Sequence, residues 1–394
     1  MSSVATHDSQ AIALLCAPIA VGDTKPLTPS EWAKLASSIH ASGLERPGAL
    51  VGVTASELGF QLGIDGVLAD RLAALLDRGG TLAFELERLQ SRGVWVVARP
   101  DEEYPESLRR RLGLRAPALL FGAGRRELPP DRGVAVVGSR DASAAALEFA
   151  AELGRSLASE GASVVSGAAR GVDRTAMRAA MDAGGSAVGV VADSLVRLTQ
   201  QPDIRAALAE ELLTLVTPHA PEARFSVGNA MARNRLIYCL SDAAVVVATA
   251  AGSGGTWAGA VENLKAGWVP LAVWSSDAAP AGNRELLALG GRPVTAPRAQ
   301  ELFDGASGLP AVSESDGSTV EAGEDDTRLL EAVARFLATP RTETEVRTEF
   351  ALGPERARAV LTAGLDAGRF VRTGKPLRYG VVGGALQATL FDGA

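Results

Sequence analysis

The feature that most constrains the fold is a regular alternation of short apolar runs and helical stretches between residues 133 and 298. The runs VAVVG, ASVVSG and AVGVVA alternate with AAALEFAAELGRSLASEG and GVDRTAMRAAMDAGG, and the runs AAVVVAT and VPLAVW continue the series. Continuous apolar runs are typical of parallel strands that are buried on both faces and connected by helices. The sequence therefore predicts an α/β fold with a doubly wound, mostly parallel, Rossmann-like sheet.

The residues before this region predict a separate helical module. From about 29 to 92, apolar residues recur at intervals of three and four and are punctuated by glycine, whereas VWVVA (94–98) and ALLF (118–121) are typical of strands. The apolar stretch 11–21 follows ten residues without Lys or Arg and is too short to span a bilayer, which favours a buried helix. We expect a module of the SAM or helix-hairpin-helix kind over 1–92 and an extended Rossmann-like domain over 93–298.

The residues after the sheet predict a linker and a second domain. Residues 299–327 contain no Lys or Arg and are rich in Gly, Ser, Asp and Glu, which is typical of an acidic, flexible linker. From 328 on, three helical stretches precede RFVRTGKPLRYGVV, which predicts a hairpin turning at 374–376, and Thr342 and Glu345 have the spacing of a capping box. We expect a winged-helix domain over 328–385 and a tail over 386–394.

Composition narrows the classes of function. The 394 residues carry a formal net charge of -7, so phosphate can be bound only at a local basic site. Cys16 and Cys239 lie far apart, which speaks against a disulfide framework and favours the cytoplasm. His7, His40 and His219 share no ligand spacing, so we expect no metal site, and we expect no membrane partner.

Small residues and arginines follow three of the predicted strands. Because the carboxyl ends of parallel strands meet at one edge of a sheet, where helix amides point outward, these loops are expected to come together. Each loop alone is typical of a tight turn from strand to helix, but together they indicate a phosphate site. The expected residues are Gly138, Ser139, Arg140, Ser166, Gly167, Arg170, Gly252, Ser253 and Gly254.

A cationic cluster in GNAMARNRLIY completes the predicted site. Arg233, Asn234 and Arg235 are predicted to lie at the start of the helix that precedes the third of these strands. Arginine offers a planar fork for bidentate phosphate contacts. Residues two apart on a helix lie about 200° from each other, so both arginines can face one ligand only if the helix begins at or after Arg233.

The predicted site contains no nucleophile with a paired base, because none of the histidines or cysteines lies in these loops. Asp173 is a candidate general base, although an acidic residue in the first turn of a helix is more often placed there by the helix dipole. We therefore expect no catalytic residue and no cofactor.

The order of motifs resembles the DprA, or Smf, family of DNA-processing proteins. The motifs are YPESL, APALLFGAG, VAVVGSR, VVSGAARGVD, RNRLIYCLSDAAVVV, GSGGTWAGA and GNRELLALGG, between about 100 and 298. The resemblance implies a pocket for single-stranded DNA, a role in loading the RecA recombinase during natural transformation and recombination, and a possible homodimer. It assigns the pocket to Gly138, Ser139, Arg140, Ser166, Gly167, Arg233, Asn234 and Arg235.

The chain departs from the family pattern and leaves two other functions open. Met177 stands where the family usually has a histidine, and Ser194 lies where it usually has a glycine-rich turn. A phosphoribohydrolase-like enzyme is one alternative, with Glu262 one helical turn from the position of the catalytic glutamate. A nucleotide-sensing regulator that binds duplex DNA through Arg356 and Arg358 is the other.

Overall fold

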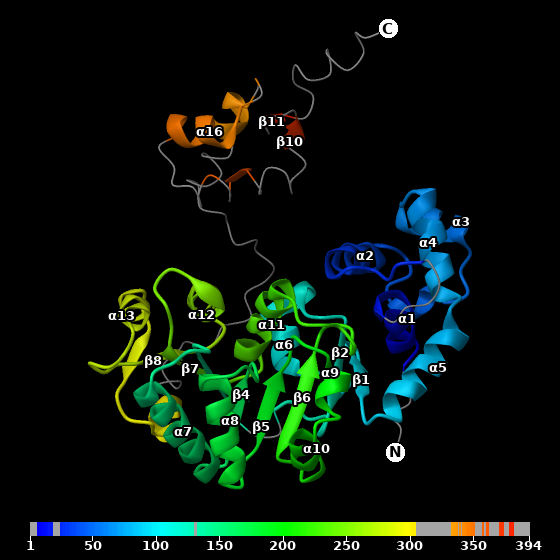
Figure 1. The fold of residues 1–394 in the computed structure, drawn as a ribbon. Helices are drawn as coiled ribbons and strands as arrows, with labels where there is room; N and C mark the ends of the chain where they lie inside the picture. Colours follow the sequence, from blue (N-terminus) through cyan, green and yellow to red (C-terminus); the bar gives the residue numbers. More distant parts are fainter. Residues whose placement is uncertain are drawn as a thin grey trace. The chain divides into compact units, whose positions relative to one another are not determined.

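The apolar runs form one nine-stranded sheet in the computed structural model (Figure 1). The structure describes residues 6–18, 24–129, 132–304, 332–337, 339, 341–350, 357, 360–361, 370–373 and 378–381. The order is β1-β2-β6-β5-β4-β3-β7-β8-β9, and only β1–β2 and β2–β6 are antiparallel. The predicted doubly wound, mostly parallel sheet is confirmed.

The strand bounds follow the apolar runs closely. Two strands, β6 and β9, were not among those expected. The strands are β1 (Trp95–Ala98), β2 (Leu119–Ala123), β3 (Gly133–Gly138), β4 (Ser163–Ser166), β5 (Ala187–Val190), β6 (Leu213–Thr217), β7 (Ala243–Ala248), β8 (Leu271–Trp274) and β9 (Arg292–Val294).

Helices cover both faces of the sheet because successive strand residues point to opposite sides. Val134 and Val136 of β3 belong to a core with α7 and α8, which pack side by side (Figure 1), whereas Ala135 and Val137 belong to a core with α6 and α11. The helices of this region are α6 (Glu106–Leu112), η2 (Gly113–Arg115), α7 (Ala144–Ser159), α8 (Val172–Asp182), α9 (Leu195–Leu198), α10 (Pro202–Ala209), α11 (Val227–Cys239), α12 (Gly254–Ala266) and α13 (Ala281–Ala288).

The N-terminal residues are helical, as predicted, and the apolar stretch that begins at residue 11 is buried in α1 from Ala11 to Leu15. These helices share a core with β1 and β2, so up to residue 304 the described chain is one compact unit. That these helices form a module of the SAM or helix-hairpin-helix kind, and that it ends at residue 92, stay predictions. The elements are α1 (His7–Cys16), α2 (Pro29–Ala41), η1 (Pro47–Leu50), α3 (Ala55–Leu62), α4 (Gly66–Leu76) and α5 (Gly79–Gln90).

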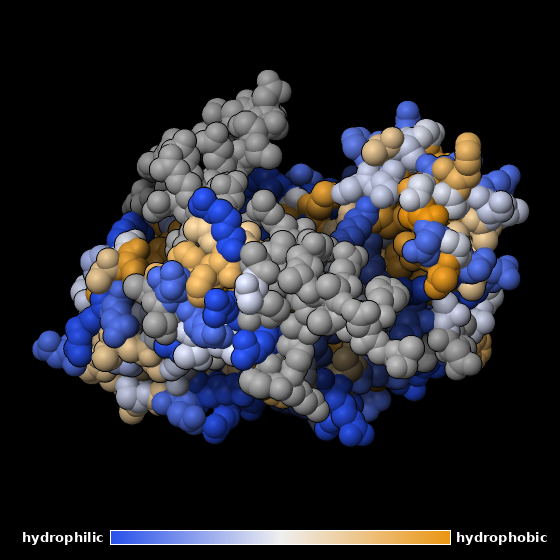
Figure 2. Space-filling view, turned by 90° about the horizontal axis from the view of Figure 1, so that it is seen from above, coloured by the Kyte–Doolittle hydropathy of each residue, from blue (hydrophilic) through white to orange (hydrophobic). Residues whose placement is uncertain are grey.

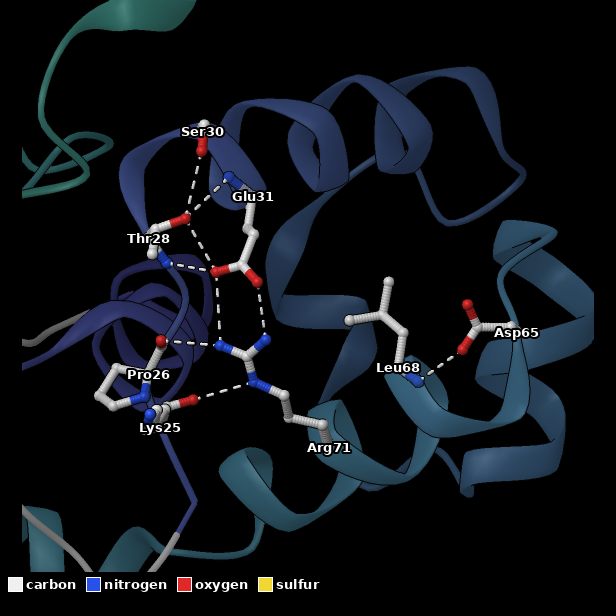
Figure 3. Close-up of polar contacts among 8 residues, drawn as sticks. All are labelled: Lys25, Pro26, Thr28, Ser30, Glu31, Asp65, Leu68 and Arg71. Atoms are coloured by element: carbon white, nitrogen blue, oxygen red, sulfur yellow. Dashed lines mark hydrogen bonds and ion pairs between the residues drawn. The ribbon is translucent and has the colours of Figure 1, made fainter. Parts of the chain in front are cut away.

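One arginine ties the start of α2 to α4. Arg71 donates to Glu31 Oε1 at 2.7 Å and to the carbonyls of Lys25 and Pro26, while Glu31 also closes a capping box with Thr28 (Figure 3). The hydrogen bonds from Arg71 and Thr28 lower the pKa of Glu31 to about 2. These contacts fix how two short helices meet.

Large apolar side chains are also exposed on the N-terminal helices. The surface of these helices shows apolar side chains among hydrophilic ones (Figure 2), and Phe60, Val67 and Phe84 are the large exposed ones there. Among the described residues, no helix has the length and apolar character needed to cross a membrane.

The predicted linker begins too early. Residues Ala299–Asp304 form helix α14, in which Ala299 and Leu302 are buried and Phe303 lies under the Arg132 guanidinium at 3.6 Å. The prediction failed here because it rested on the absence of Lys and Arg over the whole segment, whereas the first six residues carry the apolar groups that dock on the domain. Residues 305–327 lie outside the described part.

The second unit contains parts of the predicted winged helix. The capping box of Thr342 and Glu345 begins α16 (Glu343–Glu349), and β10 (Phe370–Thr373) pairs antiparallel with β11 (Arg378–Val381). Val333, Val346, Phe370 and Tyr379 are among the residues of its small core. The complete winged helix stays a prediction, because residues 351–356, 362–369 and 374–377, with Arg356 and Arg358, lie outside the described residues. The same holds for the tail, 386–394.

Candidate nucleic-acid interface

The carboxyl ends of β4, β3 and β7 lie next to one another in the sheet, as the positions of the glycine loops require. Ser139, just after β3, donates its amide to the Ala248 carbonyl at 2.8 Å and accepts from the amide of Val172 at 3.3 Å. These bonds hold the three loops together and place the starts of α8 and α12 at the same edge. A cavity of about 390 Å³ opens there.

Most of the predicted residues line this cavity. Gly138 is needed because a Cβ there would lie 2.6 Å from Val172 Cγ2, so a larger residue would push α8 away from the strand. Asn234 donates to the Gly255 carbonyl at 3.1 Å and so links α11 to the start of α12. The predicted residues on the cavity wall are Gly138, Ser139, Arg140, Arg233, Asn234, Ser253 and Gly254.

The cationic cluster lies in the middle of a helix, not at its start. Helix α11 begins six residues earlier than Arg233, after Ser226, whose hydroxyl accepts from the Asn229 amide. The prediction missed this start because Gly228 and Asn229 lower the helix propensity of the segment before the cluster, whereas the serine cap is a local polar signal. Arg233 and Arg235 therefore point to different sides of α11.

Arg233 points inward and is 5% exposed. Its Nη2 donates to the Gly167 carbonyl at 2.9 Å, while its buried Nε and Nη1 have no hydrogen-bond partner in the described part of the chain. Burial lowers the pKa of Arg233 to about 10, and the charge of Asp173 works in the opposite direction. A guanidinium held in this way retains donor capacity that an anion in the cavity can use.

Arg235 points away from the cavity. Its Nη2 lies 3.7 Å from Glu262 Oε1, and neither residue belongs to the cavity wall. Arg235 is therefore not brought together with the other predicted residues of the cavity, because it lies two residues after Arg233 on the same helix. Glu262, the other member of this pair, likewise does not line the cavity.

Asp173 is buried beside Arg233 at the start of α8. Its Oδ1 accepts from the Gly138 amide at 3.3 Å. Burial raises its pKa to about 6, while Arg233 and the backbone amides of Gly138, Ala169 and Gly167 act to lower it. The carboxylate thus joins the ends of β3 and β4 to the guanidinium on α11, which is a positioning role.

Besides Arg235, four predicted residues do not line the cavity of about 390 Å³: Ser166, Gly167, Arg170 and Gly252. The Ser166 hydroxyl is buried and donates to the Val136 carbonyl at 2.6 Å, so it serves the sheet. Gly252 adopts a left-handed φ of 65° in the loop before α12 and is not on a described cavity wall. Gly167 lies on the wall of a neighbouring cavity, where its carbonyl accepts from Arg233.

The neighbouring cavity has a volume of about 820 Å³ and lies over the ends of β4 and β5. Arg140 and Arg233 line both cavities, and Arg170 lines the larger one. Met177, at the position where a histidine was expected, contributes to its apolar wall. Ser194 instead caps α9 by accepting from the Arg197 amide.

Sequence reasoning missed an apolar rim. The Arg140 guanidinium lies 5.2 Å from the centre of the Phe225 ring, a cation–π distance, and Phe225 is 46% exposed. Val227 and Met231 on the first turns of α11 also line the cavity and are exposed. The available signal was three large apolar residues, Phe225, Val227 and Met231, spaced just before the arginines.

In the ranges that the structure describes, no group of three or more His, Cys, Asp or Glu side chains is placed to hold an ion. His219 lies near the site, where its Nε2 is 3.2 Å from the Asn229 carbonyl, and burial lowers its pKa.

Comparisons with known proteins agree with one another. A family model described as "DNA recombination-mediator protein A" matches residues 95–300. A putative DNA processing protein DprA from Mycobacterium tuberculosis is 34% identical over 240 residues, covering 56% of this chain and 60% of that protein. The DNA processing protein DprA of Bacillus subtilis is 26% identical over 166 residues, covering 41% and 54%. The chain thus spans less than two thirds of either relative.

A solved structure is similar in fold. The X-ray structure of DNA processing protein A from Streptococcus pneumoniae aligns with a TM-score of 0.55 and 20% identity, covering 71% of this chain and 98% of that one. At this identity the likeness describes the fold alone.

Proposed function

Because the chain belongs to the DNA recombination-mediator protein A family, we propose that it is a DNA-processing protein that binds single-stranded DNA at the cavity on the strand ends. The observation that carries this proposal is the combination of Arg140 with Phe225 at the rim and Arg233 below them. Guanidinium groups address the backbone phosphate, while an exposed ring gives a base a face on which to stack. An unpaired base is needed for such stacking, which favours a single strand over a duplex.

The loops add donors that do not depend on base identity. The starts of α8 and α12 direct backbone amides toward the strand ends, where an anion is stabilised by the helix dipole. Contacts of this kind read the sugar-phosphate backbone, which every strand shares. The proposed binding is therefore insensitive to base sequence.

The wider role is proposed from family membership. We place the protein in the cytoplasm, where it would protect incoming single strands and assist loading of RecA recombinase in natural transformation and recombination. RecA and a second copy of the chain are the proposed protein partners. Co-sedimentation of the full chain with RecA on single-stranded DNA, compared with RecA alone, tests the first, and sedimentation velocity tests the second.

The first test is binding of single-stranded and duplex oligonucleotides over a salt series. We expect preference for the single strand, with similar affinities for different base sequences. Arg140→Ala should weaken binding on every sequence alike and lower the slope of log K against log salt by about 0.7, the value for one lost phosphate contact on a single strand.

Arg235→Ala is the matched control, because it removes the same charge from the outer side of α11. Its partly exposed pair with Glu262 contributes at most about 1 kcal/mol, so affinity and salt slope should stay at wild-type values. Equal affinity of the wild-type protein for single strand and duplex would contradict the proposal, as would equal losses in the two variants.

A further inference from the structure

A second basic surface extends from the larger of the two cavities at the strand ends. It is a groove between α7 and α8 with a volume of about 620 Å³. Its floor consists largely of small residues, so the long side chains along it determine its chemistry. Four of those side chains are arginines, one from α7, one from the turn before α8 and two from α8 itself: Arg155, Arg170, Arg174 and Arg178.

The spacing of these arginines forms a stripe. Arg174 and Arg178 are four residues apart on α8 and share one side of the helix, while Arg170 lies just before the N-cap of α8. Like charges at this spacing destabilise a helix by about 0.2–0.5 kcal/mol per pair. Arg174 also lies in the first turn of α8, where the helix dipole disfavours a cation. The stability of the helix therefore does not explain the stripe.

The neighbouring acids leave much of this charge available. Arg170 lies 3.0 Å from Asp141 and Arg178 lies 3.7 Å from Asp182, and all four side chains are at least 65% exposed. Such exposed ion pairs contribute little to stability, so the arginine can readily bind another anion in place of its acidic partner. Arg155 and Arg174 are exposed and have no ion pair or side-chain hydrogen bond within the part of the chain that the structure describes.

The two helices hold the groove in a fixed shape. A Cβ at Gly154 of α7 would overlap the Ala176 carbonyl of α8, so the absence of a side chain there lets the two helices pack in direct contact. Arg155 follows this contact on one wall and Arg174 lies on the other. The guanidinium groups therefore extend from two rigid supports toward one groove.

The groove is continuous with the proposed DNA site. The cavity of about 820 Å³ shares Arg140 with the smaller cavity and shares Arg170, Arg174 and Arg178 with the groove. A basic path therefore leads from the strand ends onto the outer surface of α7 and α8.

We propose that this α7–α8 groove is a second backbone-binding site for the same single strand, which continues along it after leaving the cavities. The inference rests on the proposed function, because the ligand is the strand bound at the strand ends. Arg155, Arg174 and Arg178 would each contact phosphate, and binding at the groove adds to affinity without adding base specificity.

The test is a length series of thymidine oligonucleotides, from about 4 to about 16 nucleotides, the range of site sizes found in single-strand-binding domains. The variant Arg155→Ala/Arg174→Ala/Arg178→Ala should match the wild type on the shortest oligonucleotides that bind. On the longest, it should bind more weakly, with a salt slope lower by about 2, the sum for three contacts.

The control variant Arg110→Ala/Arg115→Ala/Arg284→Ala removes three exposed arginines from α6, η2 and α13 and should retain the wild-type dependence on length. Arg155→Lys/Arg174→Lys/Arg178→Lys keeps the charge and should retain most of the salt slope. If the groove variant follows the wild type at every length, the groove inference is overturned while the proposed function stands. If the wild type binds no single strand at all, the proposed function itself fails.

Discussion

The strand-end cavity and the α7–α8 groove use arginine in opposite ways. In the cavity, Arg233 is buried, bonded to the Gly167 carbonyl and placed beside the buried carboxylate of Asp173. In the groove, Arg155 and Arg174 are exposed on helix surfaces. Arg233 therefore belongs to the core of the domain, whereas Arg155 and Arg174 could be substituted without disturbing any buried contact.

This difference separates two kinds of contribution to binding. A buried guanidinium is preorganised, but its removal leaves its partners uncompensated and so affects folding as well. An exposed guanidinium affects mainly the salt-dependent attraction to phosphate. Variants of the two regions should therefore differ most in the ratio between lost stability and lost affinity.

The largest effect is expected for Arg233→Met. The change removes the donor to the Gly167 carbonyl and leaves the buried Asp173 carboxylate without the nearby positive charge, and an uncompensated buried charge costs about 3 kcal/mol or more. Chemical denaturation should show this loss of unfolding free energy, together with loss of single-strand binding.

The double variant Asp173→Asn/Arg233→Met separates the two losses, because it removes the uncompensated charge. Its stability should recover in part while binding stays weak. If Arg233→Met unfolds at the wild-type denaturant concentration, Arg233 does not have the buried role described here and the contrast with the groove disappears.

An intermediate effect is expected for Asp173→Asn, as a change in pH dependence. The pKa of Asp173 is about 6 in the folded protein, above the usual value of 3.8, so between these values the folded state binds more protons than the unfolded state. This group therefore makes stability rise as pH falls from about 6 toward 4, by at most about 1.4 kcal/mol per pH unit.

The asparagine variant lacks this contribution but can still accept the hydrogen bond from Gly138. The difference in unfolding free energy between variant and wild type should therefore change across pH 4–6 and stay constant above it. A difference that does not vary with pH would show that Asp173 titrates normally.

The smallest effect is expected in the groove, for Arg174→Gln. This change removes a cation from the first turn of α8 and its repulsion with Arg178 one turn later, so stability should rise by about 0.5 kcal/mol. Thermal melts of this variant and of Arg284→Gln, an exposed arginine on α13, provide the measurement. A clear loss of stability in Arg174→Gln alone would mean that the groove arginines serve the fold.

The sequence alone predicted the sheet because its signals are local. Runs such as VAVVG and AAVVVA have no polar side chain, and a strand buried on both faces needs no other pattern. The glycine loops were found for the same reason, since a strand followed by small residues and a helix is typical of a ligand-binding edge. The resemblance of the ordered motifs then pointed to the family that the comparisons show.

The N-terminal helices combine contacts that the sequence predicts with contacts that it does not. Their caps, such as Thr28 with Glu31, lie within four residues of each other and can be read from the chain. That Arg71 reaches the same carboxylate from forty residues away depends on how α2 and α4 pack, so nothing in the local pattern indicates it.

Tertiary structure decided which charged groups face the ligand. The sequence determined most of the strands, the glycine loops and the presence of Arg233, Asn234 and Arg235, because these depend on neighbouring residues. It did not determine strands β6 and β9 or the start of α11, and a helix that begins at Val227 sends Arg233 to the core and Arg235 to Glu262. It also could not show that Arg155 of α7 lies across a groove from Arg174 of α8, because that distance is set by the packing of two helices at Gly154. Orientation and long-range contact are properties of the packed chain, since each depends on residues far apart in sequence.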